Sequence, residues 1–276
     1  MTTAADFSRQ SFLGAGSERT LADTRVLIAG LGGGGSHIAQ QLAHLGVGHI
    51  AVADPQIIEA SNLNRLIGAT DADVTAQTPK VEIARRLING IRPWIDVEVS
   101  QTSWQAADHL LRSAHVVFGC LDGFRQRMYL ESAARSFMLP LIDIGMDVTR
   151  LSEDRYTVAG QMILTLPGGP CMRCLGFLKI QHLEREENEY ADAGINPQVV
   201  WTNGTLASLA VGAFVRLMTP WFPSSHTFEW LELDGDNQCV SRSRQPDYMA
   251  PGPCRHFSNN ELGDPFFKVP QMTGET

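Results

Sequence analysis

The chain has 276 residues and carries 22 Lys and Arg against 30 Asp and Glu, for a formal net charge of −8. Hydrophobic residues make up 43% and charged residues 19%, a balance that supports a buried core and excludes an intrinsically disordered protein. The acidic excess argues against nucleic acid as a general partner.

The sequence carries no sign of a membrane or secreted protein. No apolar run approaches the roughly 20 residues that span a bilayer, and the opening residues lack the apolar segment of a secretory signal. The five cysteines are irregularly spaced, and one pair stands as Cys171-Met-Arg-Cys174. Such pairs in a reducing compartment bind metal more often than they form disulfides. We therefore expect a cytoplasmic protein with no membrane partner.

Strands and helices alternate through the first 150 residues. Short apolar runs predict the strands, and apolar residues at helical spacing predict the helices. In chain order, the expected elements are a strand at 25–29, a helix at 36–44, a strand at 49–53, a helix at 80–89, a strand at 97–100, a helix at 106–112, a strand at 116–119, a helix at 124–137 and a strand at 139–144. This alternation predicts an α/β fold: a Rossmann-like, doubly wound, mostly parallel sheet with helices on both faces.

The second half has a different pattern, with short strands and one apolar helix. The expected elements are a strand at 161–166, an exposed crossover loop or helix at 182–188, a buried helix at 204–218, and a strand at 228–233 with a turn at 234–237. Thr202 or Asn203 is expected to cap the buried helix. We therefore expect a mixed, β-rich half at 151–276 after the α/β half at 1–150.

A glycine run stands where the first strand feeds the first helix. It reads Gly30-Leu-Gly32-Gly33-Gly-Gly35, and Asp54 ends the next strand. Gly30 permits the tight turn, Gly32 lets a phosphate approach the backbone, and Gly35 lets the helix pack closely on the strand. The free N–H groups of the helix attract anions, and Asp54 is placed to accept hydrogen bonds from a ribose. We therefore expect a nucleotide site, which ATP or a dinucleotide would fill with the same residues.

Three charged residues help to distinguish these nucleotides. Arg65 closes the segment Asn62-Leu-Asn-Arg, and Lys80 opens the helix at 80–89; together they provide the positive charge that a triphosphate needs. Asp122 follows the strand at 116–119, at the carboxyl edge where ligands of such sheets bind, and its carboxylate can hold Mg²⁺. Taken singly, each residue also fits a solvated or helix-capping role.

The order and spacing of these motifs are those of a known family. The motifs, over about residues 7 to 256, are Phe7-Ser-Arg9-Gln10, the glycine run, Gly46-Val-Gly48, Asp54, Ser61-Asn62-Leu63-Asn64-Arg65, Lys80, Asp122 and Cys171-x-x-Cys174. The chain resembles the ThiF/MoeB adenylyltransferases, which share their fold with the ubiquitin-activating enzymes. The resemblance implies a single adenylation domain over 1–276, with residues 1–150 as its nucleotide-binding half. It also implies ATP-dependent adenylation of a protein's C-terminal carboxylate, with release of pyrophosphate.

The resemblance assigns roles to the site residues. Those that would bind ATP are Gly30, Gly32, Gly33, Gly35, Asp54, Asn62, Arg65 and Lys80. Those that would take part in catalysis are Arg9, Arg65, Lys80 and Asp122. Asp122 would serve Mg²⁺, and Arg9 would reach the ATP of a partner subunit in a homodimer. The implied substrate is a ubiquitin-like or sulfur-carrier protein that ends in glycine. Its carboxylate is already a nucleophile, so catalysis needs placement and charge stabilisation but no general base.

The chain departs from the family pattern at the cysteines. Members often bind structural zinc through two Cys-x-x-Cys pairs, of which only Cys171 and Cys174 stand here. In place of the second pair the chain reads Pro251-Gly-Pro-Cys254-Arg-His256. Four-coordinate zinc would use Cys171, Cys174, Cys254 and either His256 or Cys239. The alternative is that this zinc site has decayed.

Many relatives also carry a cysteine in the crossover loop that accepts the activated tail as a thioester. No cysteine lies between Leu175 and Gln238, and Tyr190 is the nearest counterpart. Cys120, two residues before Asp122, is a second candidate, although buried cysteines at strand ends are common. We therefore expect adenylation without a thioester on this chain.

Three other functions stay open from the sequence. An NAD-dependent oxidoreductase would use the glycine run and Asp54 but gives Arg65, Lys80 and Asp122 no joint purpose. A non-catalytic scaffold would keep the fold for dimerisation, although each charged position of the expected ATP site is kept. A tRNA-modifying cyclising enzyme of the same fold gains little from the net charge of −8.

Overall fold

The structure is a computed structural model that describes residues 4–181, 197–222, 226–249, 252–257, 262–264 and 266–270. Its strands are β1 (Arg25–Ala29), β2 (His49–Ala53), β3 (Asp96–Ser100), β4 (Val116–Gly119), β5 (Leu141–Ser152), β6 (Arg155–Thr165), β7 (Phe228–Asp234) and β8 (Cys239–Arg242). Its α-helices are α1 (Ser17–Asp23), α2 (Gly33–Leu45), α3 (Asp71–Thr75), α4 (Lys80–Ile91), α5 (Asp108–Ser113), α6 (Phe124–Ser136) and α8 (Val200–Met218). Its 3₁₀ helices are η1 (Ala4–Leu13), η2 (Ala60–Asn62) and η3 (Gln245–Tyr248).

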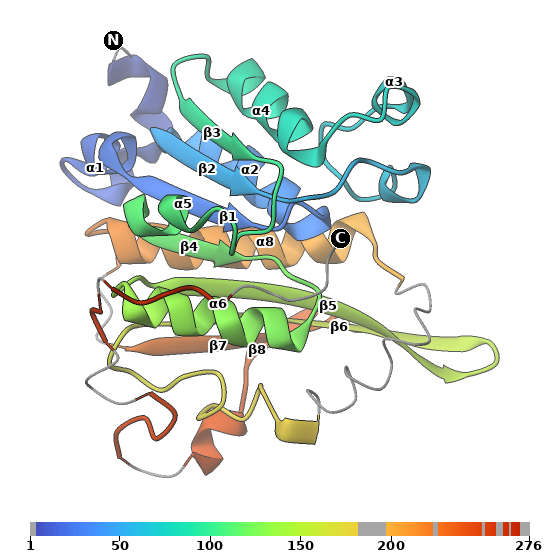
Figure 1. Ribbon diagram of the computed structural model, residues 1–276, viewed down its shortest axis with the longest axis vertical. Helices are drawn as coiled ribbons and strands as arrows, with labels where there is room; N and C mark the ends of the chain where they lie inside the picture. Colours follow the sequence, from blue (N-terminus) through green and yellow to red (C-terminus); the bar gives the residue numbers. More distant parts are fainter. Residues whose placement is uncertain are drawn as a thin grey trace.

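The eight strands of the described residues form one sheet in the order β3-β2-β1-β4-β5-β6-β7-β8. The first five strands of this order pair in parallel, and the last three are antiparallel to their neighbours. Figure 1 shows α5 and α6 on one face, with α2, α4 and α8 on the other. The expected Rossmann-like α/β fold, with a mostly parallel sheet and a mixed C-terminal half, is therefore confirmed.

Strand β1 shows why a short apolar run specifies this architecture. Val26 and Ile28 belong to the core under α2 and α8, whereas Leu27 and Ala29 belong to the core under α5 and α6. All four side chains are buried, because a central parallel strand is covered by helices on both faces. Neighbours β2 and β4 lie on either side of β1, so all three strands end at the same edge.

Strand β5 is the first of several differences from the sequence expectation, which also did not include α1, α3 or β8. Strand β5 does not end near Ile144 but continues to Ser152 and pairs with β6 in a long hairpin, which projects beyond the rest of the sheet in Figure 1. The outer part of the hairpin is largely exposed on both strands, so it lacks the alternation that marks a half-buried strand.

Helix α8 is the second difference, since it begins at Val200 and not at 204. Neither Thr202 nor Asn203 caps it, so the expected cap is wrong. The Asn203 amide instead donates to the Val199 carbonyl oxygen over 2.9 Å, and its side chain lies against Gly33 of α2. Close packing of α8 on α2 thus decides the position of this side chain.

A charged cluster holds the excursion between β2 and α4 in place. The Arg86 side chain donates to both carboxylate oxygens of Asp73, at 2.6 and 2.7 Å, and to the Gly68 carbonyl oxygen at 2.9 Å. The hydroxyl of Thr70 donates to Asp73 over 2.7 Å and caps α3. The hydrogen bonds from Arg86 and Thr70 hold the pKa of Asp73 well below its usual range. The cluster thus ties the loop after η2 to helix α4.

Among the described residues, no helix has the length and apolar character needed to cross a membrane.

We expect Asp73→Asn to lower the free energy of unfolding by about 1–3 kcal/mol at pH 7, because a part-buried charge-assisted network is lost. The carboxyl pKa is lower in the folded state, so its contribution is complete above the unfolded value near 4 and is lost as the pH falls further. Urea unfolding of both proteins should therefore differ at pH 7 and converge in acid. Asp71→Asn, at an exposed carboxylate of α3, should change the stability little; an equal loss in both variants would contradict this account.

Candidate functional site

The glycine turn lies between the ends of three strands. Gly30 has φ +93°, a conformation that favours glycine, and a Cβ there would stand 2.4 Å from the carbonyl oxygen of Cys120. Its N–H donates to the carbonyl oxygen of Ala53 over 2.9 Å. A Cβ on Gly35 would stand 2.0 Å from the carbonyl oxygen of Gly30. The expected tight turn at Gly30 and close helix-to-strand packing at Gly35 are both present.

The other glycines of the run differ in their surroundings. A Cβ on Gly33 would stand 2.4 Å from the Asn203 amide nitrogen, and one on Gly34 would stand 2.6 Å from Ile144. Gly32 alone in the run would point a Cβ into open space, with no described atom within 4 Å. No side chain caps α2 among the described residues, so the N–H groups of its first turn are available to an anion.

The Asp54 carboxylate accepts a hydrogen bond from the glycine turn. It is buried, with one oxygen accepting from the Leu31 N–H over 2.7 Å and the other from the Gln56 N–H over 2.8 Å. The expected role at the ribose was drawn from its place at the end of β2. The contact with Leu31 adds a second role that the sequence did not reveal, which is to hold the glycine turn itself.

Lys80 lies at the start of α4 with its ammonium pointing toward the same edge. It is 5% exposed, and its Nζ donates to the Gln56 side-chain oxygen over 2.5 Å. Burial lowers its pKa, while the nearby carboxylates of Asp54 and Asp122 raise it and Arg65 lowers it. Lys80 therefore lies within electrostatic range of Asp54, Asp122 and Arg65.

Arg65 and Asn62 are both held by their own loop. The Arg65 guanidinium donates to the Ser61 carbonyl oxygen over 2.7 Å and to the Asn64 side chain over 3.0 Å. The Asn62 side-chain oxygen accepts the Glu59 N–H over 3.1 Å. These hydrogen bonds hold the loop that carries the arginine in its conformation.

A polar bridge crosses the site between this loop and Asp122. The Asn64 amide donates to the Gln198 carbonyl oxygen over 3.0 Å, and the Gln198 amide donates to the Asp122 carboxylate over 3.2 Å. Asp122 is exposed, and Gly123, not Asp122, is the N-cap of α6. The carboxylate therefore faces the site and does not cap the helix. Gln56 and Gln198 lie outside any motif, so sequence reasoning missed them.

Two residues are set apart from this group. Burial, and next the Asp143 carboxylate, raise the pKa of the Cys120 thiol far above its usual range, so the thiol is a poor nucleophile. Arg9 is exposed on η1, whose Phe7 packs against Gly46 at the far end of α2. Helix α2 has 13 residues and is therefore about 20 Å long. The structure thus does not bring Arg9 to the glycine turn of its own chain.

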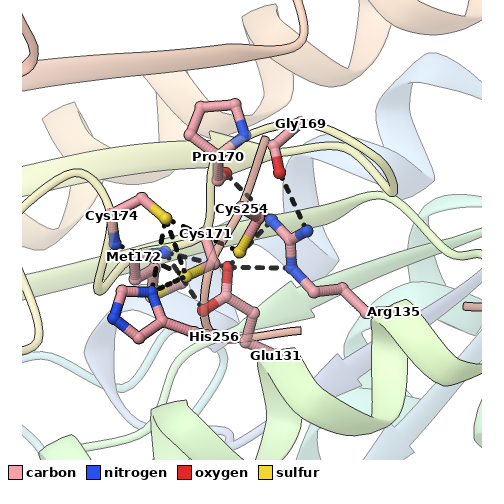
Figure 2. A network of polar contacts seen from close by, with 9 residues as sticks. All are labelled: Glu131, Arg135, Gly169, Pro170, Cys171, Met172, Cys174, Cys254 and His256. Atoms are coloured by element: carbon pink, nitrogen blue, oxygen red, sulfur yellow. Dashed lines mark hydrogen bonds and ion pairs between the residues drawn. The ribbon is translucent and has the colours of Figure 1, made fainter. Parts of the chain in front are cut away.

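A second cluster, of three cysteines and one histidine, lies beyond the C-terminal part of α6 (Figure 2). The ligand atoms of Cys171, Cys174, Cys254 and His256 all lie within 4.8 Å of one another. Cys239 is exposed on β8 and is not among them. Of the two alternatives for the fourth ligand, the structure therefore favours His256.

The separations within this cluster fit a tetrahedral metal. Zinc–sulfur bonds of about 2.3 Å and zinc–nitrogen bonds of about 2.05 Å at tetrahedral angles place two sulfurs about 3.8 Å apart and sulfur and nitrogen about 3.6 Å apart. The Cys171–Cys174 and Cys174–Cys254 sulfurs are 3.6 and 3.5 Å apart, and His256 Nδ1 lies 3.4 and 3.3 Å from the first two sulfurs. This donor set is one that zinc prefers.

The crossover loop expected at 182–188, Tyr190 and Pro251 lie outside the described residues.

The chain matches known proteins over most of its length. The ThiF family pattern matches residues 7–248. The chain belongs to the ThiF family. It is 32% identical over 157 residues to the SAMP-activating enzyme E1 of Haloferax volcanii, a match of 56% of this chain and 54% of that protein. It is 30% identical over 208 residues to the sulfur carrier protein ThiS adenylyltransferase of Escherichia coli, a match of 74% of this chain and 77% of that protein.

Solved structures support the fold. The crystal structure of E. coli MccB with ATP has a TM-score of 0.70 and 19% identity, and covers 87% of this chain and 71% of that chain. The match to the Haloferax enzyme spans about half the length of that relative. The chain therefore has both the family pattern and the fold of ThiF proteins.

We expect Gly35→Ala to lower the free energy of unfolding by about 3 kcal/mol or more, because its methyl would strike backbone that cannot move aside. Gly32→Ala, three residues earlier, should change the stability by less than about 1 kcal/mol, since its methyl would stand in open space. The same methyl should weaken nucleotide binding. Urea unfolding and equilibrium nucleotide binding would test this contrast, and equal stability losses would show that the turn is not packed as described.

Proposed function

We propose that this protein adenylates the C-terminal carboxylate of a ubiquitin-like or sulfur-carrier protein, using ATP and releasing pyrophosphate. The observation that carries the proposal is the convergence of Lys80, Arg65 and Asp122 beside the glycine turn, in a chain of the ThiF family. Two cations and one exposed carboxylate suit a triphosphate with Mg²⁺.

The reaction follows from placement and charge. A carboxylate oxygen of the substrate attacks the α-phosphorus of ATP, the bond from that phosphorus to the oxygen bridging to the β-phosphate breaks, and pyrophosphate leaves with the bonding electrons. Lys80 and Arg65 stabilise the charge that develops on the leaving oxygens, and the first turn of α2 binds phosphate. Asp122 would hold Mg²⁺, which neutralises phosphate charge when bound. The substrate carboxylate needs no general base.

The names of the relatives support the substrate class. One is an adenylyltransferase for the sulfur carrier ThiS, and another is a SAMP-activating enzyme. We infer that the partner of this chain is a carrier of that kind with a slim C-terminal glycine. An NAD-dependent oxidoreductase gains no support, because it leaves the Lys80, Arg65 and Asp122 cluster without a purpose.

The proposal includes direct transfer of the activated tail to an outside acceptor. Cys120 is only partly exposed and the pKa of its thiol is raised, and Cys171, Cys174 and Cys254 are gathered in the second cluster. A thioester on this chain would therefore lack a suitable cysteine near the expected adenylate. The sequence-based prediction of adenylation without such a thioester is kept.

A homodimer is the second part of the proposal. Helices α2 and α8 lie side by side, and their 13 and 19 residues include one Asp, Glu, Lys or Arg, the ion-paired Arg216. Beside them, Phe12, Leu45, Val215 and Trp221 help to line a groove of about 370 Å³. Uncharged exposed surface of this kind is typical of an interface, and a second copy of this chain is the proposed occupant. It would bring the exposed Arg9 into the partner's site.

Zinc is the third part. Cys171, Cys174, Cys254 and His256 would hold it, and it would join the 171–174 loop to the 252–257 segment as a structural site.

Two further features stay predictions. One is a single adenylation domain over 1–276, with nucleotide-binding residues 1–150 and β-rich residues 151–276. The other is the cytoplasmic location.

We expect Lys80→Met and Asp122→Ala each to lower carrier-dependent ATP–pyrophosphate exchange by about 100-fold or more, because each removes charge that stabilises the transition state. Lys268→Met, at an exposed lysine of the C-terminal segment, is the matched control and should keep full exchange. Equilibrium binding should favour ATP over NAD. Normal exchange in Asp122→Ala would remove that residue from the mechanism, and preferred binding of NAD would remove the proposed function.

We expect Arg9→Ala and Arg65→Ala to be inactive as separate dimers but active when mixed. In a mixed dimer one site combines the intact Arg65 of one chain with the intact Arg9 of the other, so random exchange at equal amounts should restore about a quarter of the wild-type exchange rate. Exchange assays after subunit mixing would measure this. Mixtures that stay as inactive as their components would argue against supply of Arg9 by the partner subunit.

A further inference from the structure

Helix α6 carries a buried ion pair that points away from the nucleotide site. Glu131 and Arg135 stand one turn apart and are 1% and 2% exposed. A buried ion pair loses hydration at a cost that the mutual attraction alone often fails to offset. Burial indeed raises the pKa of Glu131, despite the nearby Arg135. A solvent-exposed ion pair would stabilise the helix as well as this one. The burial of this pair is therefore explained by its other partners.

Both side chains are directed to the loop that precedes and contains Cys171 and Cys174 (Figure 2). The two carboxylate oxygens of Glu131 accept the Met172 N–H at 3.0 and 3.1 Å. The Arg135 guanidinium donates to the carbonyl oxygens of Gly169 and Pro170, at 3.0 and 2.9 Å. Three backbone groups of an irregular loop are thus satisfied by one helix.

This support acts directly on the cysteine ligands. Met172 lies between Cys171 and Cys174, and its N–H is fixed by Glu131. On the far side of the turn, the Cys174 N–H donates to the Cys171 sulfur over 3.4 Å, and the Leu175 N–H donates to the Cys171 carbonyl oxygen over 2.9 Å. The separation of the two sulfurs therefore depends on a turn that α6 holds in shape.

The same arginine also contacts the segment that carries the other two ligands. The Arg135 guanidinium carbon lies 5.2 Å from the centre of the Phe257 ring, in the range of a cation–π interaction. Phe257 directly follows His256, and Cys254 lies three residues before it. Arg135 thus touches both halves of the cluster, which are separated by about 80 residues of chain.

We propose that Glu131 and Arg135 are positioning residues for the metal. They hold the 169–174 loop and the 254–257 segment so that the four ligands are assembled before the metal arrives. The inference rests on the proposed zinc site and is independent of the adenylation reaction. Groups that orient ligands in this way commonly change metal affinity by 10–100-fold when they are replaced.

The test is a zinc competition titration against a chromophoric chelator, with the reduced, full-length protein. Glu131→Gln removes the charge but keeps an acceptor, and Arg135→Lys keeps the charge but loses the fork that bridges two carbonyl groups. Both should raise the Kd for zinc by 10–100-fold. Glu229→Gln, which alters the Arg216–Glu229 ion pair of α8 and β7, is the matched control and should leave the Kd unchanged.

A purely structural role of the pair predicts a different result. In that case the substitutions would lower the melting temperature of the metal-free protein, while the Kd for zinc stayed within about twofold of wild type. This outcome would overturn the inference. If Glu131→Gln fails to fold, Phe257→Leu removes only the ring beside Arg135, and it should raise the Kd several-fold; an unchanged Kd would count against the proposal.

The wild-type protein separates the two proposals. If it takes up no zinc, the zinc site fails and the positioning role fails with it. If the wild-type protein and the variants bind zinc with the same affinity, only the positioning role fails. Pyrophosphate exchange reports separately on the proposed adenylation.

Discussion

The close approach of three strand ends at Gly30 is the constraint on which the proposed site depends. Strand β1 pairs in parallel with both β2 and β4, so the three strands end at one edge, and only a residue without a side chain fits between them. Helix α2 starts directly after this turn, and no side chain caps its first turn. The Asp54 carboxylate accepts the N–H of Leu31 within the turn. Asp122 reaches the same edge from β4, and Lys80 reaches it from α4. The charges are therefore gathered by the topology and not by any local motif.

Helix α6 joins this edge to the cysteine cluster. It begins two residues after Asp122, its first turn is fixed to β5 by Arg127, and its later turns support the 169–174 loop. Arg127 pairs with Asp143 and also donates to the Ile144 carbonyl oxygen over 3.0 Å. Burial raises the pKa of Asp143 to about 7 in spite of this arginine. Such an interaction adds little net stability, but it defines how the helix lies on the sheet. One rigid helix thus relates the proposed magnesium ligand to the proposed zinc site.

The fold could be predicted from the sequence where local chemistry decides it. Apolar runs such as β1 and the glycine run between a strand and a helix each specify their structure through neighbouring residues. Features decided by distant contacts could not be predicted in this way. The exposed part of the β5–β6 hairpin has no buried face, and the position of the Asn203 side chain depends on packing against the glycine run. The same limit applies to Gln198 in the site, to Glu131, and to the preference for His256 over Cys239, since each depends on residues far away in the chain.

The position of the exposed cysteine bears on the chemistry after adenylation. Cys239 lies on β8 at the edge of the sheet, and β8 is separated from β4 by β5, β6 and β7. Neighbouring strands lie about 4.8 Å apart, so β8 is about 19 Å from the strand that leads to Asp122. A covalent link to Cys239 would require the activated tail to cross this width of the sheet, while Cys120 is near enough but only partly exposed, with the pKa of its thiol raised far above the usual range. An adenylate formed beside Asp122 therefore has no good thiol nucleophile on the described part of its own chain. Under the proposed function, the acceptor must enter from outside, and the open edge of the sheet is where it would meet the activated carboxylate.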